Sequence, residues 1–265
     1  MSHSYLMKKR RALMAALDLW YQPPGMAATN VLAAYQFKGI ASEAAALQDL
    51  SMYRRDLTKG SQTYNNVSYT PTWSSASGFT FDAVHGGASG YLDNSGLDNA
   101  AIKAAVVRYA NLTQTNRGYL ITAGGADGSA QIYAATTVYI KDDGLFNYTG
   151  PGFVVSPYSS ASWVGTVGYV STGKTSGVIG ANFADDKALF LDGIRTATQN
   201  TDSGKTYTDL GGESLHGYTF GNSHSSKSDL NNATFAGKVV IAAAFYGTAL
   251  TNAEHRYIAD AMALL

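Results

Sequence analysis

The acidic residues of this chain lack the pattern that hydrolysis of a glycosidic bond requires. A retaining glycosidase places two carboxyl groups about 5–5.5 Å apart. The glutamates Glu43, Glu213 and Glu254 are isolated in the sequence. The adjacent aspartate pairs, 142–143 and 185–186, have side chains that diverge along a strand or sit in turns. The chain also has no Gly-x-Ser-x-Gly nucleophile motif. We therefore expect that this protein is not an enzyme.

The histidines and one glycine-lysine motif are the remaining candidates for chemistry. The five histidines show neither His-x-x-x-His nor His-Glu-x-x-His spacing, so they predict no zinc site. Residues 168–175 fit the pattern G-x-x-x-x-G-K-[ST] of a phosphate-binding loop. Such a loop needs a helix N-terminus directly after it, and residues 176–180, Ser-Gly-Val-Ile-Gly, are a poor helix start. We interpret this motif as a hairpin turn rather than a nucleotide site.

Sugar recognition needs an exposed aromatic platform beside amide, hydroxyl or imidazole groups. Side chains of this kind fall in or near predicted loops at Tyr158, Trp163, Tyr218, Asn222 and His224. A tyrosine in such a chain is more often a half-buried part of a sheet than a ligand platform. We expect Trp20 and Trp73 to be buried anchors instead. The five loop residues are therefore the candidate glycan contacts.

The composition excludes several partners. The 265 residues include 19 Lys+Arg and 19 Asp+Glu, and a neutral chain has no general attraction for nucleic acid or an anionic membrane. No apolar run reaches the roughly 18 residues of a membrane-spanning helix. The absence of cysteine indicates folding in a reducing compartment. Abundant glycine (28) and tyrosine (18) suit short strands joined by tight turns.

Strand patterns separated by turn clusters dominate the middle of the chain. Without helices between them, they exclude a parallel α/β fold. Asp192-Gly193 is a strong signal for a two-residue hairpin turn, which would place Leu189, Leu191, Ile194 and Thr196 on one face. The expected strands cover residues 101–109, 119–123, 131–140, 145–148, 162–170 and 177–182.

Helices are expected at the two ends. Residues 1–22 carry a basic run followed by apolar residues at helical spacing, and Pro23-Pro24 ends the pattern. The apolar positions of this expected assembly arm are Leu13, Met14, Leu17, Trp20 and Tyr21. A signal peptide is the alternative, but Asp18 interrupts the apolar stretch.

The last helix is predicted to begin with a capping box, in which the Thr251 hydroxyl and the Glu254 carboxylate satisfy each other's backbone amides. Its apolar face would be Ile258, Ala261, Met262 and Leu265, and we expect this helix to close the sandwich.

Two stretches resemble a known family. The Leu191-Asp192-Gly193 hairpin, Phe235-Ala236-Gly237 and residues 239–251 resemble the end of the LamG-like, concanavalin A-like jelly roll. Residues 33–50, with Ala33-Ala34-Tyr35, Lys38-Gly39 and Asp49-Leu50, resemble tailed-phage proteins that carry such a domain. Pro71-Thr72-Trp73, Gly78–Asp82 and Gly90–Asp93 follow in the order of that family, so the resemblance spans about residue 30 to the C-terminus.

The resemblance implies an all-β, antiparallel two-sheet jelly-roll sandwich over residues 26–265, with residues 1–25 as an attachment arm. It implies a non-catalytic virion structural protein, associated with tail or fibre or decorating the capsid, that acts in host-surface attachment. Its partners would be other virion proteins and sister subunits in a homo-oligomer such as a trimer, after folding in the bacterial host cytoplasm. A lectin-type module that binds a surface glycan is the alternative, and a glycoside hydrolase is the least favoured.

Many domains of this family carry a calcium ion at the rim of the sandwich. Oxygen ligands for such an ion could come from Asp93, Asn94 and Asp98, or from Asp127. Aspartate and asparagine serve equally well in turns without a metal. We favour the turn interpretation, so no cofactor is predicted.

Overall fold

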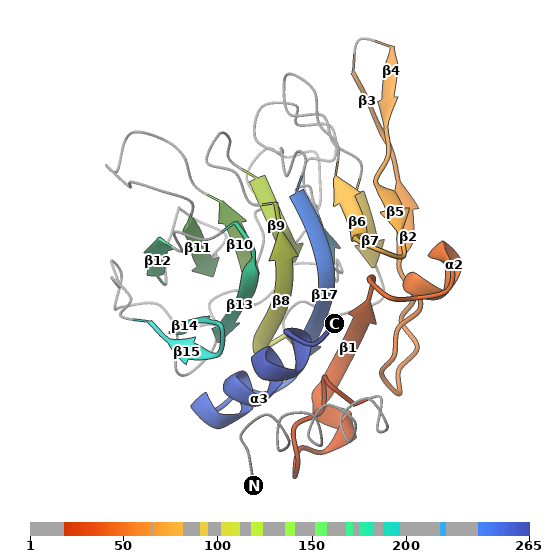
Figure 1. Ribbon diagram of the computed structural model, residues 1–265. Helices are drawn as coiled ribbons and strands as arrows, with labels where there is room; N and C mark the ends of the chain where they lie inside the picture. The colour runs from red at the N-terminus through yellow and green to blue at the C-terminus, as the bar shows by residue number, and fades with distance from the viewer. Residues whose placement is uncertain are drawn as a thin grey trace, which may run out of the picture.

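The chain forms antiparallel β-sheets with a helix at its C-terminal end (Figure 1). The computed structural model describes residues 19–64, 66–81, 91–94, 102–111, 118–123, 136–140, 152–157, 168–171, 175–182, 188–196, 218–220 and 238–265. Within these residues, no helix is both long and apolar enough to cross a membrane. The helices among the described residues are the short η1 (Ala28–Asn30) and α2 (Glu43–Ala46), and the longer α3 (Asn252–Met262).

Two sheets face each other. The strand order of the larger sheet is β15 (Ile194–Arg195), β14 (Ala188–Leu191), β13 (Gly177–Asn182), β8 (Ala104–Ala110), β17 (Lys238–Tyr246), β6 (Gly78–Phe81) and β5 (Thr72–Ser74), and β1 (Val31–Gln36) also pairs with β17. The order of the smaller sheet is β12 (Gly168–Ser171), β11 (Gly152–Pro157), β10 (Thr136–Ile140), β9 (Gly118–Ala123), β16 (Tyr218–Phe220), β7 (Tyr91–Asn94) and β2 (Thr58–Gly60). A separate hairpin consists of β3 (Gln62–Tyr64) and β4 (Val67–Tyr69).

The space between the sheets is filled by apolar side chains that alternate along the strands. On β8, Ala105, Val107 and Tyr109 face this inner cluster, whereas Ala104 and Val106 face the opposite side. Both sets are buried, which explains why β8 and β17 read as nearly continuous apolar runs.

Aromatic rings fix the two sheets against each other. Phe220 comes from the smaller sheet, and its ring lies edge-on to Phe37 at 5.8 Å and to Tyr35 at 6.3 Å between centroids. Phe37 also meets Phe79 edge-on at 5.3 Å. Each contact has the T-shaped geometry that aromatic pairs favour.

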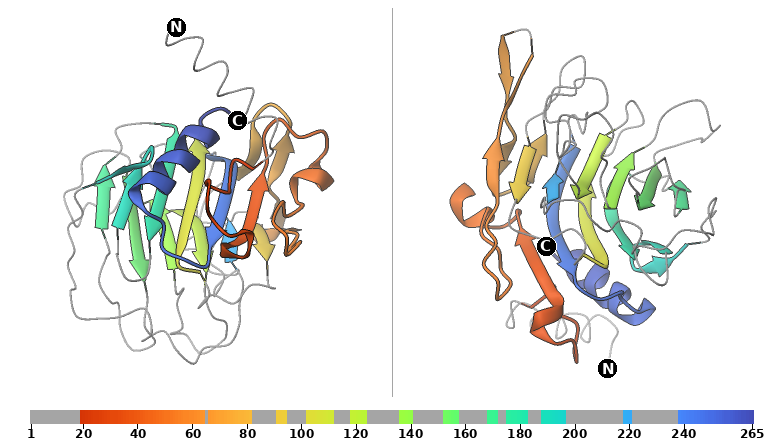
Figure 2. Two further views of the ribbon diagram at one scale, coloured as in Figure 1. Left: turned by 90° about the horizontal axis from the view of Figure 1, so that it is seen from below. Right: turned by 180° about the vertical axis from the view of Figure 1, so that it is seen from behind.

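A second apolar cluster covers the outer face of the larger sheet, where α3 lies across the strands (Figure 2). Ile258, Ala261 and Met262 of α3 pack there, as the apolar face predicted from the sequence requires. The helix therefore covers the back of one sheet, and the prediction that it closes the sandwich is corrected on this point. The segment before β1 contributes Trp20 and Tyr21 to the same cluster.

Two local predictions are confirmed. Asp192 and Gly193 have φ values of 49° and 74°, Leu191 pairs with Ile194, and the Thr196 amide donates to the Leu189 carbonyl at 2.9 Å. The capping box of α3 is complete, because the Glu254 amide donates to Thr251 Oγ1 at 3.2 Å and the Thr251 amide donates to Glu254 Oε2 at 2.7 Å. The local sequence is sufficient to determine both features.

Candidate functional site

The predicted glycan contacts are only partly within the described residues. Tyr218 is the first residue of β16. Tyr158 and Trp163 follow β11 in the sequence, and Asn222 and His224 follow β16; all four lie outside the described residues.

The strand register shows which of these positions share an end of the smaller sheet. Pro157 pairs with Thr136, Thr136 with Ala123, and Ala123 with Tyr218, so the end of β11 and the start of β16 are level. Three strand spacings of about 4.8 Å separate them by about 14 Å. The chain leaves β16 in the other direction, through Phe220. Tyr218 and the end of β11 therefore lie at the same end of the smaller sheet. Phe220, the last residue of β16 before Asn222 in the sequence, lies farther from that end.

Two of the oxygen-bearing residues considered and not favoured as calcium ligands lie at the same end of the sheet. Asn94 pairs with Tyr218 and Asp93 with Thr219, whereas Asp98 and Asp127 lie outside the described residues. Among the described side chains, no three histidine or acidic groups gather closely enough to hold a metal ion.

The described end of the predicted arm is built into the domain. Residues 19–22 form a turn rather than a helix, and the Trp20 and Tyr21 side chains are buried with their rings edge-on at 5.4 Å. The Tyr21 hydroxyl donates to the Leu50 carbonyl at 2.8 Å, and the Tyr246 hydroxyl donates to the Tyr21 carbonyl at 2.8 Å. Leu13, Met14 and Leu17 lie outside the described residues.

Two side chains of β17 and β8, Tyr246 and Arg108, have shifted pKa values. Burial, with smaller contributions from Glu254 and Tyr21, raises the pKa of the Tyr246 phenol well above its usual range. Burial also lowers the pKa of Arg108, whose guanidinium donates to the Met262 carbonyl at the C-terminal end of α3. A cation is favourable there because the last carbonyls of a helix lack backbone partners.

A turn over residues 49–57, which we call the Asp49 turn, holds this segment from the other side. Asp49 is fully buried, and its Oδ1 accepts from the Ala34 and Ser51 amides at 2.9 and 2.8 Å. Its Oδ2 accepts from the Ser51 hydroxyl at 2.7 Å and the Arg55 amide at 2.8 Å. The Leu50 amide donates back to the Ala34 carbonyl at 2.8 Å, so β1 and the turn are joined on both sides of Ala34.

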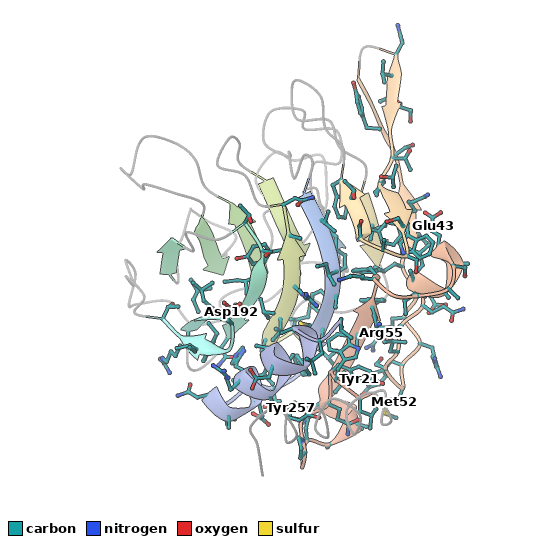
Figure 3. All side chains as sticks on the ribbon, in the orientation of Figure 1. Tyr21, Glu43, Met52, Arg55, Asp192 and Tyr257 are labelled. Carbon is teal, nitrogen blue, oxygen red and sulfur yellow. The ribbon has the colours of Figure 1, made fainter. Side chains whose placement is uncertain are left out.

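The Asp49 turn presents exposed side chains that the sequence reasoning did not single out. Met52 is 61% exposed, and Tyr53 is 38% exposed. The Arg55 guanidinium lies 4.3 Å from the centre of the Tyr53 ring, and the Tyr53 hydroxyl donates to the Thr29 carbonyl at 3.0 Å. Figure 3 shows Met52 and Tyr21 on neighbouring segments. The one sequence signal for this surface was Asp49-Leu50 within the family resemblance.

The buried histidine of α3 serves the framework. The His255 ring stacks on Phe190 with centroids 3.6 Å apart. Asn182 Oδ1 accepts from the Leu250 amide at 3.0 Å and lies 3.0 Å from His255 Nε2, so that nitrogen carries the proton. Asn182 Nδ2 donates to the Leu250 carbonyl at 2.8 Å. These contacts fix the start of α3 to β13 and leave His255 buried.

Comparison with known proteins identifies the fold and no family. No protein-family model and no curated protein match the sequence. A Trypanosoma rangeli sialidase mutant with trans-sialidase activity is similar at a TM-score of 0.50 and 14% identity, over 89% of this chain and 34% of that chain. T. rangeli sialidase in complex with 2,3-difluoro-KDN is also similar, with a TM-score of 0.50 and 12% sequence identity. The match covers 95% of this chain and 38% of that chain.

The receptor binding domain of botulinum neurotoxin C/D mosaic serotype has a lower TM-score, 0.42 at 13% identity, over 87% of this chain and 51% of that chain. The chain spans about a third of the length of the sialidases it matches. At such identities the likeness extends to the fold alone, which is a mostly β, antiparallel sandwich with a short C-terminal helix.

Proposed function

We propose that this chain is a non-catalytic structural module of a tailed-phage virion. In this proposal the sandwich has the connectivity of a LamG-like, concanavalin A-like jelly roll. Residues 1–18 form the attachment arm that joins the module to other virion proteins, at the tail, fibre or capsid surface. The displayed sandwich then faces the host surface.

The observation that carries the proposal is the way the chain enters the domain. Trp20, Tyr21 and Met26 are buried in the outer cluster, and Tyr21 is hydrogen-bonded to both the Asp49 turn and β17. An arm over residues 1–18 would therefore join the domain at a segment that is buried and hydrogen-bonded on two sides. A flexible linker would bury no aromatic rings in the domain.

The buried polar groups also favour a structural role. The Asp49 carboxylate accepts four hydrogen bonds. The His255 ring stacks on Phe190 and is hydrogen-bonded to Asn182. A catalytic carboxylate or imidazole needs a free position for the substrate near it. In the described part of the chain, these two buried groups stabilise the junctions of the fold instead.

A glycan-binding lectin-type module is the second candidate. The chain is similar in fold to about a third of the length of two T. rangeli sialidase structures, one of them in complex with 2,3-difluoro-KDN. Tyr218 is level with Pro157 at the end of β11, about 14 Å away, and Tyr158 is the next residue in the sequence, so the glycan of this proposal would lie across these strands. This binding is compatible with a place on the virion.

Two truncations test the proposal. Removing residues 1–18 leaves Trp20 and Tyr21 in place, so the truncated chain should have the same urea midpoint of unfolding as the wild type. It should nevertheless be missing from purified particles of the phage or prophage that encodes it. Removing residues 1–25 should also lower the stability by several kcal/mol, because truncating one buried tryptophan costs about 3–5 kcal/mol. The phage role is wrong if the full-length chain is absent from particles by mass spectrometry.

The glycan role has its own measurement. The folded chain is applied to an array of bacterial surface glycans, together with a Tyr218→Ala variant. The lectin alternative predicts binding that the variant weakens at least tenfold. If Tyr218→Ala binds as tightly as the wild type, Tyr218 is not part of the glycan site. If the wild type binds no glycan, the lectin alternative is wrong.

A further inference from the structure

The outer edge of β1 has no neighbouring strand among the described residues, because β1 pairs with β17 on one side only. The unpaired amides and carbonyls of such an edge are a template on which another chain can add a strand. In this protein the Asp49 turn lies there instead. The segment that follows α2 runs along the outer side of β1 (Figure 1).

The Asp49 turn makes the hydrogen bonds that a neighbouring strand would make. Asp49 Oδ1 accepts from the Ala34 amide at 2.9 Å, and the Leu50 amide donates to the Ala34 carbonyl at 2.8 Å. Ala34 therefore exchanges both of its backbone hydrogen bonds with the turn, as a residue does with its partner on a paired strand. Two residues earlier on β1, the Leu32 carbonyl accepts from Arg55 Nη1 at 2.7 Å. The turn thus occupies two successive outward positions of β1.

Two of these three contacts come from side chains. The Asp49 carboxylate takes the place of a strand carbonyl, and the Arg55 guanidinium takes the place of a strand amide. A side chain ends the ladder of the sheet, because it offers no further row of amides and carbonyls to the next strand. The turn therefore closes the edge, whereas an added strand would only move the edge outward.

The sequence of β1 shows why its edge needs a cover. Natural edge strands are protected by charged residues or proline. β1 reads Val-Leu-Ala-Ala-Tyr-Gln, which has neither, and five of its six residues are buried. Short uncharged segments of apolar and aromatic residues without proline are the kind that pairs between chains. The charges lie on the turn instead, since four of the eight residues 49–56 are Asp or Arg.

The turn is held in place against an unfavourable backbone conformation. Arg54 has a φ of 55°, in the left-handed region, whereas the other described non-glycine residues with a positive φ are asparagine or aspartate, which tolerate it. Asp49 opposes this strain, because its carboxylate also accepts from the Ser51 and Arg55 amides within the turn. Asp49 is therefore the residue whose loss would release the turn from β1.

We propose that the outer edge of β1 is a latent binding site for an extended polypeptide strand, which the Asp49 turn keeps closed within the same chain. Recognition at such an edge uses backbone amides and carbonyls. The ligand is therefore defined by an extended conformation with free backbone groups. In a purified sample whose turns are open, the strand that binds is the β1 of a second copy. The inference does not depend on the proposed function.

The test opens the turn in the isolated 265-residue chain. Asp49→Ala removes the acceptor of the Ala34 amide. Sedimentation velocity over about 1–100 μM should then show self-association at least about tenfold tighter than that of the wild type. Gly193→Ala is the matched control, because an added Cβ there would lie 2.6 Å from Arg256 Cα and disturb the hairpin of β14 and β15, not β1. It should associate like the wild type.

Hydrogen exchange shows where the contact forms. In Asp49→Ala the Ala34 amide should exchange faster than in the wild type when the chain is dilute, and more slowly as the chain associates. In the wild type its exchange should not change with concentration. If Asp49→Ala associates while the exchange of residues 31–36 stays independent of concentration, the contact lies elsewhere and the proposal is wrong.

A milder pair of variants keeps the test decisive if Asp49→Ala does not fold. Arg55→Met removes the donor to the Leu32 carbonyl and keeps Asp49. Arg256→Met removes an exposed arginine of α3 and is its control. Arg55→Met should associate at least about threefold more tightly than Arg256→Met. The proposal is overturned if Asp49→Ala associates no more tightly than Gly193→Ala, or if Arg55→Met associates no more tightly than Arg256→Met.

Discussion

Replacing Asp49 by alanine tests the central junction of the fold. The substitution removes the acceptor of four hydrogen bonds, from the Ala34 and Ser51 amides, the Ser51 hydroxyl and the Arg55 amide. The Ser51 hydroxyl can turn toward the Leu32 carbonyl, 3.5 Å away, and the half-buried Arg55 amide can reach water. The buried Ala34 and Ser51 amides are left unsatisfied.

The expected loss of stability follows from those two amides. A buried group without a partner costs about 1–3 kcal/mol, so Asp49→Ala should lower the free energy of unfolding by about 4 kcal/mol. Asp49→Asn keeps Oδ1 and loses only the Arg55 and Ser51 hydroxyl contacts, so its loss should be about 1–2 kcal/mol. Urea unfolding followed by tryptophan fluorescence measures both.

The control is a carboxylate on the surface of α3. Asp260 forms a 3.0 Å ion pair with Arg256 one turn away, and such pairs contribute about 0.5 kcal/mol or less. Asp260→Asn should therefore unfold near the wild-type urea concentration. The reasoning about Asp49 is refuted if Asp49→Ala lies within 1 kcal/mol of the wild type, or if Asp49→Asn is the more damaging change.

Three further changes test other parts of the fold. Gly193→Ala should lower the free energy of unfolding by about 2–4 kcal/mol, because the added Cβ would lie 2.6 Å from Arg256 Cα. Gly39→Ala is the control, since Gly39 has a similar φ of 77° but an added Cβ there would meet nothing nearer than 3.8 Å. If Gly39→Ala destabilised the fold as much as Gly193→Ala, the clash would not be the cause. Thr251→Ala should cost about 1–2 kcal/mol through the capping box, with Thr251→Ser restoring most of it; equal losses for both variants would point to packing instead. Tyr246→Phe should cost about 1 kcal/mol at pH 7. Folding raises the pKa of Tyr246, so this part of the wild-type stability is fully present below the tyrosine's ordinary pKa of 10.0, which applies to the unfolded chain. It falls as the pH rises past that value, by up to about 1.4 kcal/mol per pH unit, and Tyr246→Phe should lack this part of the decline.

The sequence predicted the features whose signals are local. The Asp192-Gly193 hairpin and the capped α3 depend on a few adjacent residues, and the strand over 177–182 coincides with β13. The strand expected at 145–148 lies outside the described residues, and β11 (Gly152–Pro157) was not expected. Strand spacing excluded a parallel α/β fold and the family resemblance implied the antiparallel sandwich, but the order of the strands depends on long-range pairing that neither specifies.

The candidate site was harder to predict for the same reason. The Asp49 carboxylate bonds to Ala34, which lies 15 residues earlier, and Tyr246 bonds to Tyr21, which lies 225 residues earlier. The amphipathic pattern placed Trp20 and Tyr21 on a helix, although their partners on β17 and the Asp49 turn hold them in the domain. A periodicity argument cannot anticipate a partner so distant in sequence.

The most direct test of the proposed function measures incorporation into particles. Particles produced with the full-length chain, and with the chain lacking residues 1–18, are purified and quantified by mass spectrometry against the major capsid protein. We expect the 265-residue chain to be present at a fixed ratio and the truncated chain, although folded, to be absent. Equal incorporation of the two would contradict the attachment role of the arm, and absence of the full-length chain would contradict the phage role itself.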